Sequence, residues 1–77
     1  MAKMTVRELQ VMRLVALREQ DISNVLKITP YTVRELKHRA FNKLKVKNRV
    51  QAVLKLINLG FIQPREFVLD YGGLYDR

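Results

Sequence analysis

The sequence contains no cysteine and no tryptophan, and only one histidine among its 77 residues. Without cysteine there is no disulfide and no thiolate metal ligand, and one histidine leaves too few nitrogen ligands for a structural zinc site. No apolar run reaches the ~18 residues that a membrane-spanning helix needs. The first residues lack the apolar core of a secretory signal, so we expect a cytoplasmic location and no membrane partner.

Acidic residues are also scarce, because seven Asp and Glu stand against 15 Lys and Arg, a net charge of +8 at pH 7. Residues 61–77 hold two basic and three acidic residues, a net −1, which leaves +9 for residues 1–60. Within residues 34–49, seven cations accompany a single carboxylate, Glu35. This stripe is typical of a nucleic-acid-binding surface, although a solvated helix face or a membrane-surface helix also fits it. No nucleophile has a nearby base and no glycine-rich phosphate loop occurs, so we expect neither enzymatic activity nor a cofactor.

Apolar residues recur every three or four positions in four segments, which predicts an all-α fold. We expect helices at residues 6–17, 22–27, 30–44 and 49–59, with the polar residues 18–21 forming a turn. The first helix is expected to leave Leu14 at its exposed edge. The second is expected to turn Ile22, Val25 and Leu26 inward.

Short polar residues that can cap a helix precede each of these segments. Glu8 lies three positions after Thr5, which is the spacing of a capping box. Pro30 occupies the first position of the third helix, where its missing N–H does no harm. The expected N-caps are Thr5, Asp21, Thr29 and Asn48, and Gly60 is expected to end the fourth helix in the left-handed conformation.

Two helices joined by a short turn, the second opened by Thr29-Pro30, predict a helix-turn-helix. The first turns of the second helix in such a pair meet base edges in the major groove of DNA, and side chains three or four positions apart share a face. The candidate base contacts are Tyr31, Arg34, Glu35 and His38, with an intrahelical pair to Arg39 as the alternative for Glu35. The candidate phosphate contacts are Thr29, Thr32, Arg39, Lys43, Lys45, Lys47 and Arg49.

Residues 4–59 resemble the LuxR/FixJ-type helix-turn-helix, the DNA-binding domain of many bacterial regulators. The resemblance is carried by Thr5-x-Arg7-Glu8-x-x-Val11-Met12-x-Leu14, by Ile22-x-x-x-Leu26-x-Ile28-Thr29-Pro30-x-Thr32-Val33 and by Lys43-Leu44-x-Val46-x-Asn48-Arg49-x-x-Ala52-Val53. The turn after the first helix is shorter than in the family, and Ser23 and Lys27 stand where Ala and Gly are usual.

The resemblance implies a four-helix domain at residues 1–60 with a short C-terminal extension at residues 61–77. It implies a stand-alone, sequence-specific transcriptional regulator, bacterial or phage in type, whose third helix enters the major groove of double-stranded DNA. Base contacts are then expected just after Thr32-Val33, and the fourth helix is expected to form a homodimer on an inverted repeat. The expected dimer contacts are Val50, Val53, Leu54, Ile57 and Phe61.

A second resemblance leaves another function open. Thr32-Val33-Arg34 and Arg39-Ala40-x-x-Lys43-Leu44 are also similar to the −35-reading helix of sigma-factor region 4. On this alternative the protein is an interaction module that docks on RNA polymerase or another regulator. The apolar extension fits either function, because it can pack on the core, extend a dimer contact or bind a partner.

Overall fold

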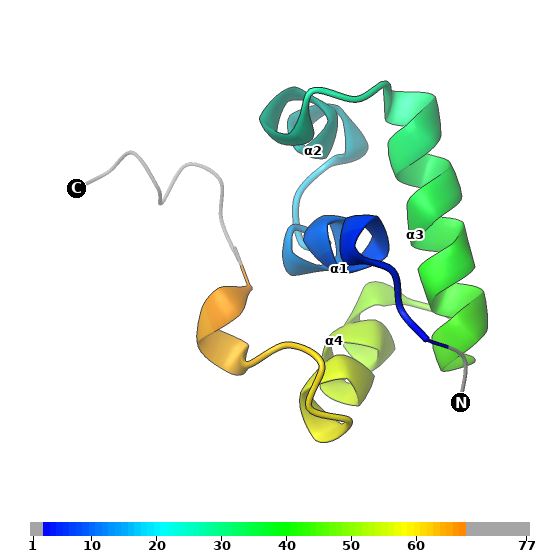
Figure 1. Ribbon diagram of the computed structural model, residues 1–77, viewed down its shortest axis with the longest axis vertical. Coiled ribbons are helices and arrows are strands. Elements are labelled where there is room, and N and C mark those ends of the chain that lie inside the picture. The colour runs from blue at the N-terminus through cyan, green and yellow to red at the C-terminus, as the bar shows by residue number, and fades with distance from the viewer. Residues whose placement is uncertain (1–2, 68–77) are drawn as a thin grey trace.

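The computed structural model describes residues 3–67, which form four α-helices and one short 3-10 turn (Figure 1). The elements are α1 (Val6–Arg13), α2 (Glu19–Leu26), α3 (Pro30–Leu44), α4 (Arg49–Asn58) and η1 (Pro64–Glu66). α3 runs along one side of the molecule, with α2, α1 and α4 placed in that order beside its length. The predicted all-α fold is confirmed. Among these residues no helix has the length and apolarity that crossing a membrane requires.

The interior consists of two hydrophobic clusters, and α1 contributes to both. The first cluster joins α1 to α3, α4 and the C-terminal turn, through Met12, Val15, Ala40, Leu44, Ala52, Leu56, Ile62 and Phe67. The second cluster joins α1 to α2 and α3, through Val11, Leu14, Leu17, Ile22, Val33 and Leu36. Because the neighbours Val11 and Met12 enter different clusters, α1 holds the two halves of the molecule together.

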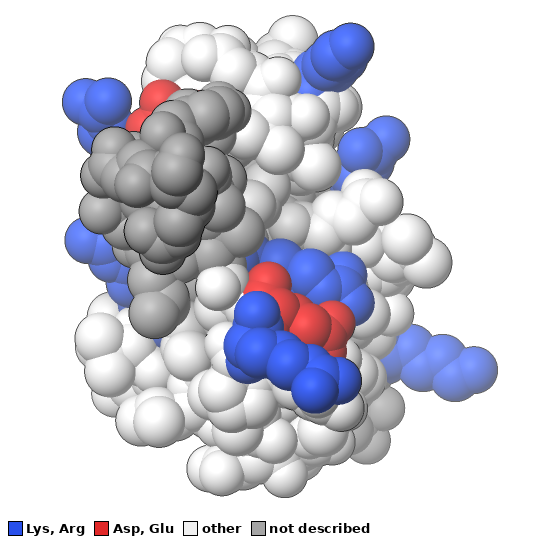
Figure 2. Space-filling view, turned by 90° about the vertical axis from the view of Figure 1, so that its left-hand side faces the viewer, with Lys and Arg blue, Asp and Glu red and all other residues white. Residues whose placement is uncertain are grey.

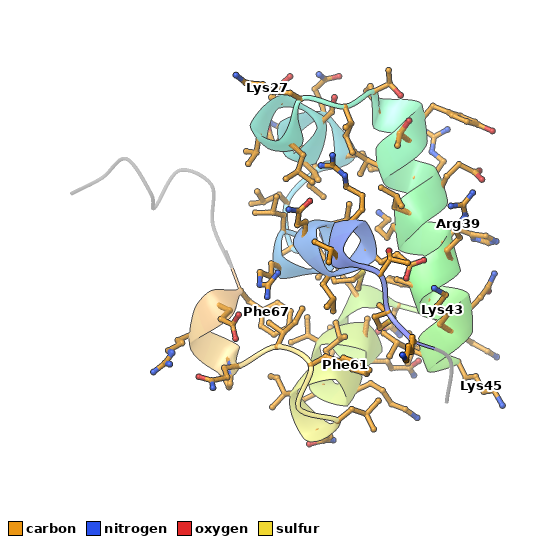
Figure 3. All side chains as sticks on the ribbon, in the orientation of Figure 1. Lys27, Arg39, Lys43, Lys45, Phe61 and Phe67 are labelled. Atoms are coloured by element: carbon orange, nitrogen blue, oxygen red, sulfur yellow. The ribbon has the colours of Figure 1, made fainter. Side chains whose placement is uncertain are left out.

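The described part of the C-terminal extension packs on the first cluster. Ile62 and Phe67 are buried, and Phe61 lies half-buried against the same cluster. Figure 3 shows Phe61 and Phe67 on the chain that follows α4. Arg13 of α1 forms an ion pair with Glu66 of η1 at 3.2 Å, which fixes the turn against the first helix. Of the three roles considered for the extension, packing on the core therefore holds for residues 61–67, and the remainder lies outside the described residues.

Three of the four N-caps form as predicted. Thr5, Thr29 and Asn48 each accept a hydrogen bond from the backbone N–H three residues later, at 2.9 to 3.1 Å. The carboxylate of Glu8 accepts from the backbone of Thr5 at 2.9 Å, which completes the capping box. Gly60 has the predicted left-handed conformation, with φ at 80°. α3 has the predicted bounds, and α4 ends one residue before the predicted end.

The predicted end of the first helix is wrong, because α1 stops at Arg13 and residues 14–17 form turns. Leu14, Val15 and Leu17 are all buried, so the expected exposure of Leu14 is also wrong. Successive residues of a helix point about 100° apart, so a continued helix would turn one of these three side chains to solvent. Leaving the helix lets Leu14 and Leu17 enter the second cluster while Val15 enters the first.

The predicted start of the second helix is also wrong, because α2 begins at Glu19 and residues 18–21 are not a turn. Arg18 has the extended backbone of an N-cap residue. Asp21, the expected cap, lies in the first helical turn, where its carboxylate accepts a hydrogen bond from Arg18 at 3.3 Å. Carboxylates are favourable at this end because the helix dipole makes it positive.

Val25 is exposed, contrary to the prediction that it points inward. Ser23 is buried instead, and its hydroxyl donates to the backbone carbonyl of Ile28. This hydrogen bond spans the turn between α2 and α3. Ser23, which stands where Ala is usual in the family, therefore links the turn after α2 to α2 itself.

Two lysines adopt the left-handed conformation at helix ends. Lys27 ends α2 with φ at 58°, and Lys45 ends α3 with φ at 58°. A residue with a Cβ is disfavoured here by about 1–2 kcal/mol, which is why glycine is usual at such positions. Because Lys27 directly precedes the turn, the packing of α2 and α3 must compensate for its conformation.

Lys27→Gly should raise the free energy of unfolding by about 1 kcal/mol, because glycine adopts this conformation without steric strain. Urea denaturation monitored by circular dichroism measures the change. Lys55→Gly is the matched control, and it should lower the free energy of unfolding by about 1 kcal/mol because Lys55 lies inside α4. A lower stability of Lys27→Gly would show that the side chain of Lys27 contributes more than its backbone strain removes.

Candidate nucleic-acid interface

α3 turns one face to the core and the other to solvent. Its buried residues are Val33, Leu36, Ala40 and Leu44. Its exposed residues are Tyr31, Arg34, His38, Arg39 and Asn42, and its C-cap Lys45 is exposed as well. Figure 3 shows Arg39 and Lys45 on the outer side of α3, away from the other helices. Three of the four predicted base contacts therefore share an open face, and the fourth, Glu35, lies half-buried beside them.

The side of the molecule opposite α3 has a different character. Figure 2 looks onto that side, and most of the described surface there is neither acidic nor basic. On the α3 side, Arg39, Lys45 and Lys47 take part in none of the five ion pairs between described residues. These three cations are exposed, so the positive potential of the chain is directed outward from α3 and the loop after it.

Glu19 of α2 binds two cations of α3. Its Oε1 accepts hydrogen bonds from Nε and Nη2 of Arg34 at 3.3 and 3.2 Å, and its Oε2 lies 3.2 Å from Nζ of Lys37. The hydrogen bond from Lys37, and then those from Arg34, hold the pKa of Glu19 below its ordinary value although partial burial acts against them. The sequence does not predict this contact, because we expected residues 18–21 to form a turn.

Two of the predicted phosphate contacts, Thr29 and Thr32, lie at the N-terminus of α3. The hydroxyl oxygens of Thr29 and Thr32 are 2.9 Å apart, so the two side chains form one polar surface at the start of the helix.

For Glu35, the alternative to base contact is an ion pair with Arg39. This pair is not among the ion pairs between described residues. The carboxylate of Glu35 is thus not engaged by that neighbour.

Lys43, a predicted phosphate contact, is engaged inside the molecule. Its Nζ donates to Oε1 of Glu8 at 2.7 Å and to the backbone carbonyl of Lys3 at 2.9 Å. Glu8 is only 2% exposed. Burial would raise the pKa of Glu8, but the hydrogen bonds from Lys43 and Thr5 outweigh it and lower the pKa below its ordinary value. The pair therefore stabilises the fold above the ordinary pKa, and its contribution disappears as the pH falls through the lowered one.

Arg49, another predicted phosphate contact, also has a partner within the chain. Its Nη1 donates to the backbone carbonyl of Ala16 at 3.2 Å, and its side chain borders an apolar groove. The groove has a volume of about 270 Å³ and is lined by Val15, Ala16, Arg49, Val50, Val53 and Leu54.

The predicted dimer contacts fall into two groups. Val50 and Leu54 are 67% and 56% exposed, and they lie four residues apart on one face of α4. Val53, Ile57 and Phe61 are half-buried and pack against the first hydrophobic cluster. The first group leaves an apolar surface beside the groove, whereas the second group already contributes to the core.

A family model described as bacterial regulatory proteins, luxR family, matches residues 2–56, which include all of α1, α2 and α3 and most of α4. The chain belongs to the LuxR family. This confirms the resemblance inferred from the sequence, and it makes the chain a DNA-binding transcription-regulator domain. The segment with η1 lies beyond the matched residues. No curated protein and no solved structure matches the chain.

Lys43→Met should lower the free energy of unfolding by about 1–3 kcal/mol, because it leaves the buried carboxylate of Glu8 without its charged partner. Lys45→Met is the matched control in this LuxR-family domain, with an expected change below about 0.5 kcal/mol because its side chain is exposed. Urea denaturation at pH 7 measures both, and the effect of Lys43→Met should shrink as the pH falls through the lowered pKa of Glu8. Equal effects of the two substitutions would contradict a structural role for Lys43.

Proposed function

We propose that this LuxR-family domain recognises a specific DNA sequence by placing α3 in the major groove. The observation that carries the proposal is the joint exposure of Tyr31, Arg34 and His38 on the outer face of α3. An α-helix fits the major groove, and its N-terminal side chains reach base edges. Arg34 suits the two acceptors of a guanine, and Glu35 suits the amino group of a cytosine.

Phosphate contacts on this proposal come mainly from Arg39, Lys45 and Lys47, which are exposed and form no ion pair among the described residues. Thr29 and Thr32 add hydroxyl groups at the positive end of α3. The two remaining candidates, Lys43 and Arg49, would first have to leave the partners that they bind within the chain. We therefore expect them to contribute less to DNA affinity.

Arg34→Ala should remove the preference for the base pair that Arg34 contacts, by roughly 5- to 150-fold in relative affinity. Lys45→Ala should instead weaken binding to all sequences alike and reduce the salt slope of log affinity by about one. A binding site selected from a random DNA pool, and titrations of its single-base variants by fluorescence anisotropy, measure both effects. If the two substitutions affect every sequence equally, base recognition through Arg34 is wrong.

A homodimer on an inverted repeat is the second part of the proposal. Val50 and Leu54 form an exposed apolar strip on α4, and a two-fold contact would pack this strip against the same strip of a second copy. Val53, Ile57 and Phe61 then form the base of the contact, since they connect the strip to the core. Such a dimer would double the number of base pairs that the protein reads.

Leu54→Glu should shift the protein to the monomer and weaken binding to an inverted repeat much more than binding to a half-site. A buried, unpaired carboxylate at a dimer contact is unfavourable by several kcal/mol. Sedimentation equilibrium measures the mass of the variant with and without DNA. Val6→Glu is the matched control, because Val6 is 74% exposed on α1 and outside the proposed contact.

The same measurement separates the alternative function, docking on RNA polymerase or another regulator. If the unaltered protein stays a monomer on its DNA site, the strip on α4 is free for such a partner. If the protein forms a dimer and Leu54→Glu breaks it, the second copy covers that strip. This result favours the dimeric transcriptional regulator over a module that docks on a partner through α4.

A further inference from the structure

Arg34 is held by a residue that belongs to the other helix of the helix-turn-helix. Its side chain is 64% exposed, yet Nε and Nη2 both donate to Oε1 of Glu19, at 3.3 and 3.2 Å. A long side chain that is free in solution loses rotamer entropy when it is ordered at an interface. An arginine that is already held by a carboxylate loses less.

The contact leaves the recognition donors of Arg34 available. The guanidinium group is planar and carries five N–H donors, of which Glu19 takes the N–H groups along the Nε–Nη2 edge. Among the described residues Nη1 has no hydrogen-bond partner, so the Nη1–Nη2 edge at the tip of the side chain still offers two parallel donors. This is the edge that matches O6 and N7 of a guanine.

Lys37 holds the carboxylate of Glu19 in place from the other side. Its Nζ lies 3.2 Å from Oε2, so each oxygen of Glu19 has a cation from α3 as its partner. The side chains of Glu19 and Lys37 are each less than a third exposed, so solvent screens this contact less than it screens the tip of Arg34. Glu19 is also the first residue of α2, where the helix dipole favours a negative charge.

We propose that Glu19 is a positioning residue for DNA recognition, which fixes the guanidinium of Arg34 so that its outer edge faces a guanine. The inference rests on the proposed function, because it requires that α3 reads bases through Arg34. It adds a residue outside α3 to the determinants of sequence preference. Glu19 acts through Arg34 and does not itself contact the DNA.

Glu19→Gln tests the proposal, because it removes the charge while it keeps the size of the side chain. The probe is the site selected from a random DNA pool, together with the variant in which the base pair read by Arg34 is replaced. We expect discrimination between the two sites to fall by about two- to tenfold, the factor expected for ordering one long side chain. Binding to unrelated DNA should tighten at the same time, since a carboxylate near the phosphates has been neutralised.

Asp21→Asn is the matched control. Asp21 lies in the same first turn of α2, loses the same charge and pairs with Arg18 rather than with α3. It should tighten binding to unrelated DNA as Glu19→Gln does, but it should leave the discrimination at the base pair read by Arg34 unchanged. Equal losses of discrimination in both variants would overturn the proposal, because a general charge effect would then explain them.

A double-mutant cycle with Arg34→Ala shows whether Glu19 acts through Arg34. In the Arg34→Ala background, Glu19→Gln should cause no further loss of discrimination at that base pair. A further loss in the Arg34→Ala background overturns the proposal, and so does full discrimination by the Glu19→Gln single variant.

If Glu19→Gln unfolds at the binding temperature, Glu19→Asp gives the same test, because it keeps the charge but shortens the reach to Arg34. If the unaltered protein selects no preferred sequence, the proposed function itself fails before any variant is compared.

Discussion

The structure depends on a short α1 that must fill two hydrophobic clusters at once. Val11 packs with α2 and α3, while Met12 packs with α3, α4 and the C-terminal turn. A helix continued through residue 17 could not bury Leu14, Val15 and Leu17 together, so the chain leaves the helical conformation after Arg13. The next helix, α2, starts at Glu19, and this residue pairs with Arg34 and Lys37 of α3.

The few carboxylates decide which of the many cations remain available. Glu8 engages Lys43 at the end of α3, and Glu19 engages Arg34 and Lys37 near its start. The pKa of each carboxyl group is lowered by these contacts, although burial opposes the effect at both. The cations of residues 34–49 therefore have two different roles in the fold. Arg34, Lys37 and Lys43 connect α3 to other helices. Arg39, Lys45 and Lys47 are exposed to solvent.

Local signals predicted the parts of the fold that depend on neighbouring residues. Thr29 before Pro30, and Asn48 before α4, mark helix starts because a cap needs a side chain only three residues from its target. The start of α2 was not predictable in this way, because Arg18 makes no side-chain cap and Asp21 lies inside the helix. The contact between Glu19 and Arg34 joins residues 15 positions apart, and no periodicity of the sequence reports such a distance.

Local patterns were enough to predict that four helices form, that the chain resembles the LuxR family, and which face of α3 turns to solvent. They suffice because apolar periodicity and capping act over one or two helical turns. Tertiary packing instead set the end of α1, the pairing of Lys37 and Lys43, and the burial of Ile62 and Phe67. These outcomes depend on which side chains meet across the interior, where one helix contributes to two clusters and one carboxylate binds two cations.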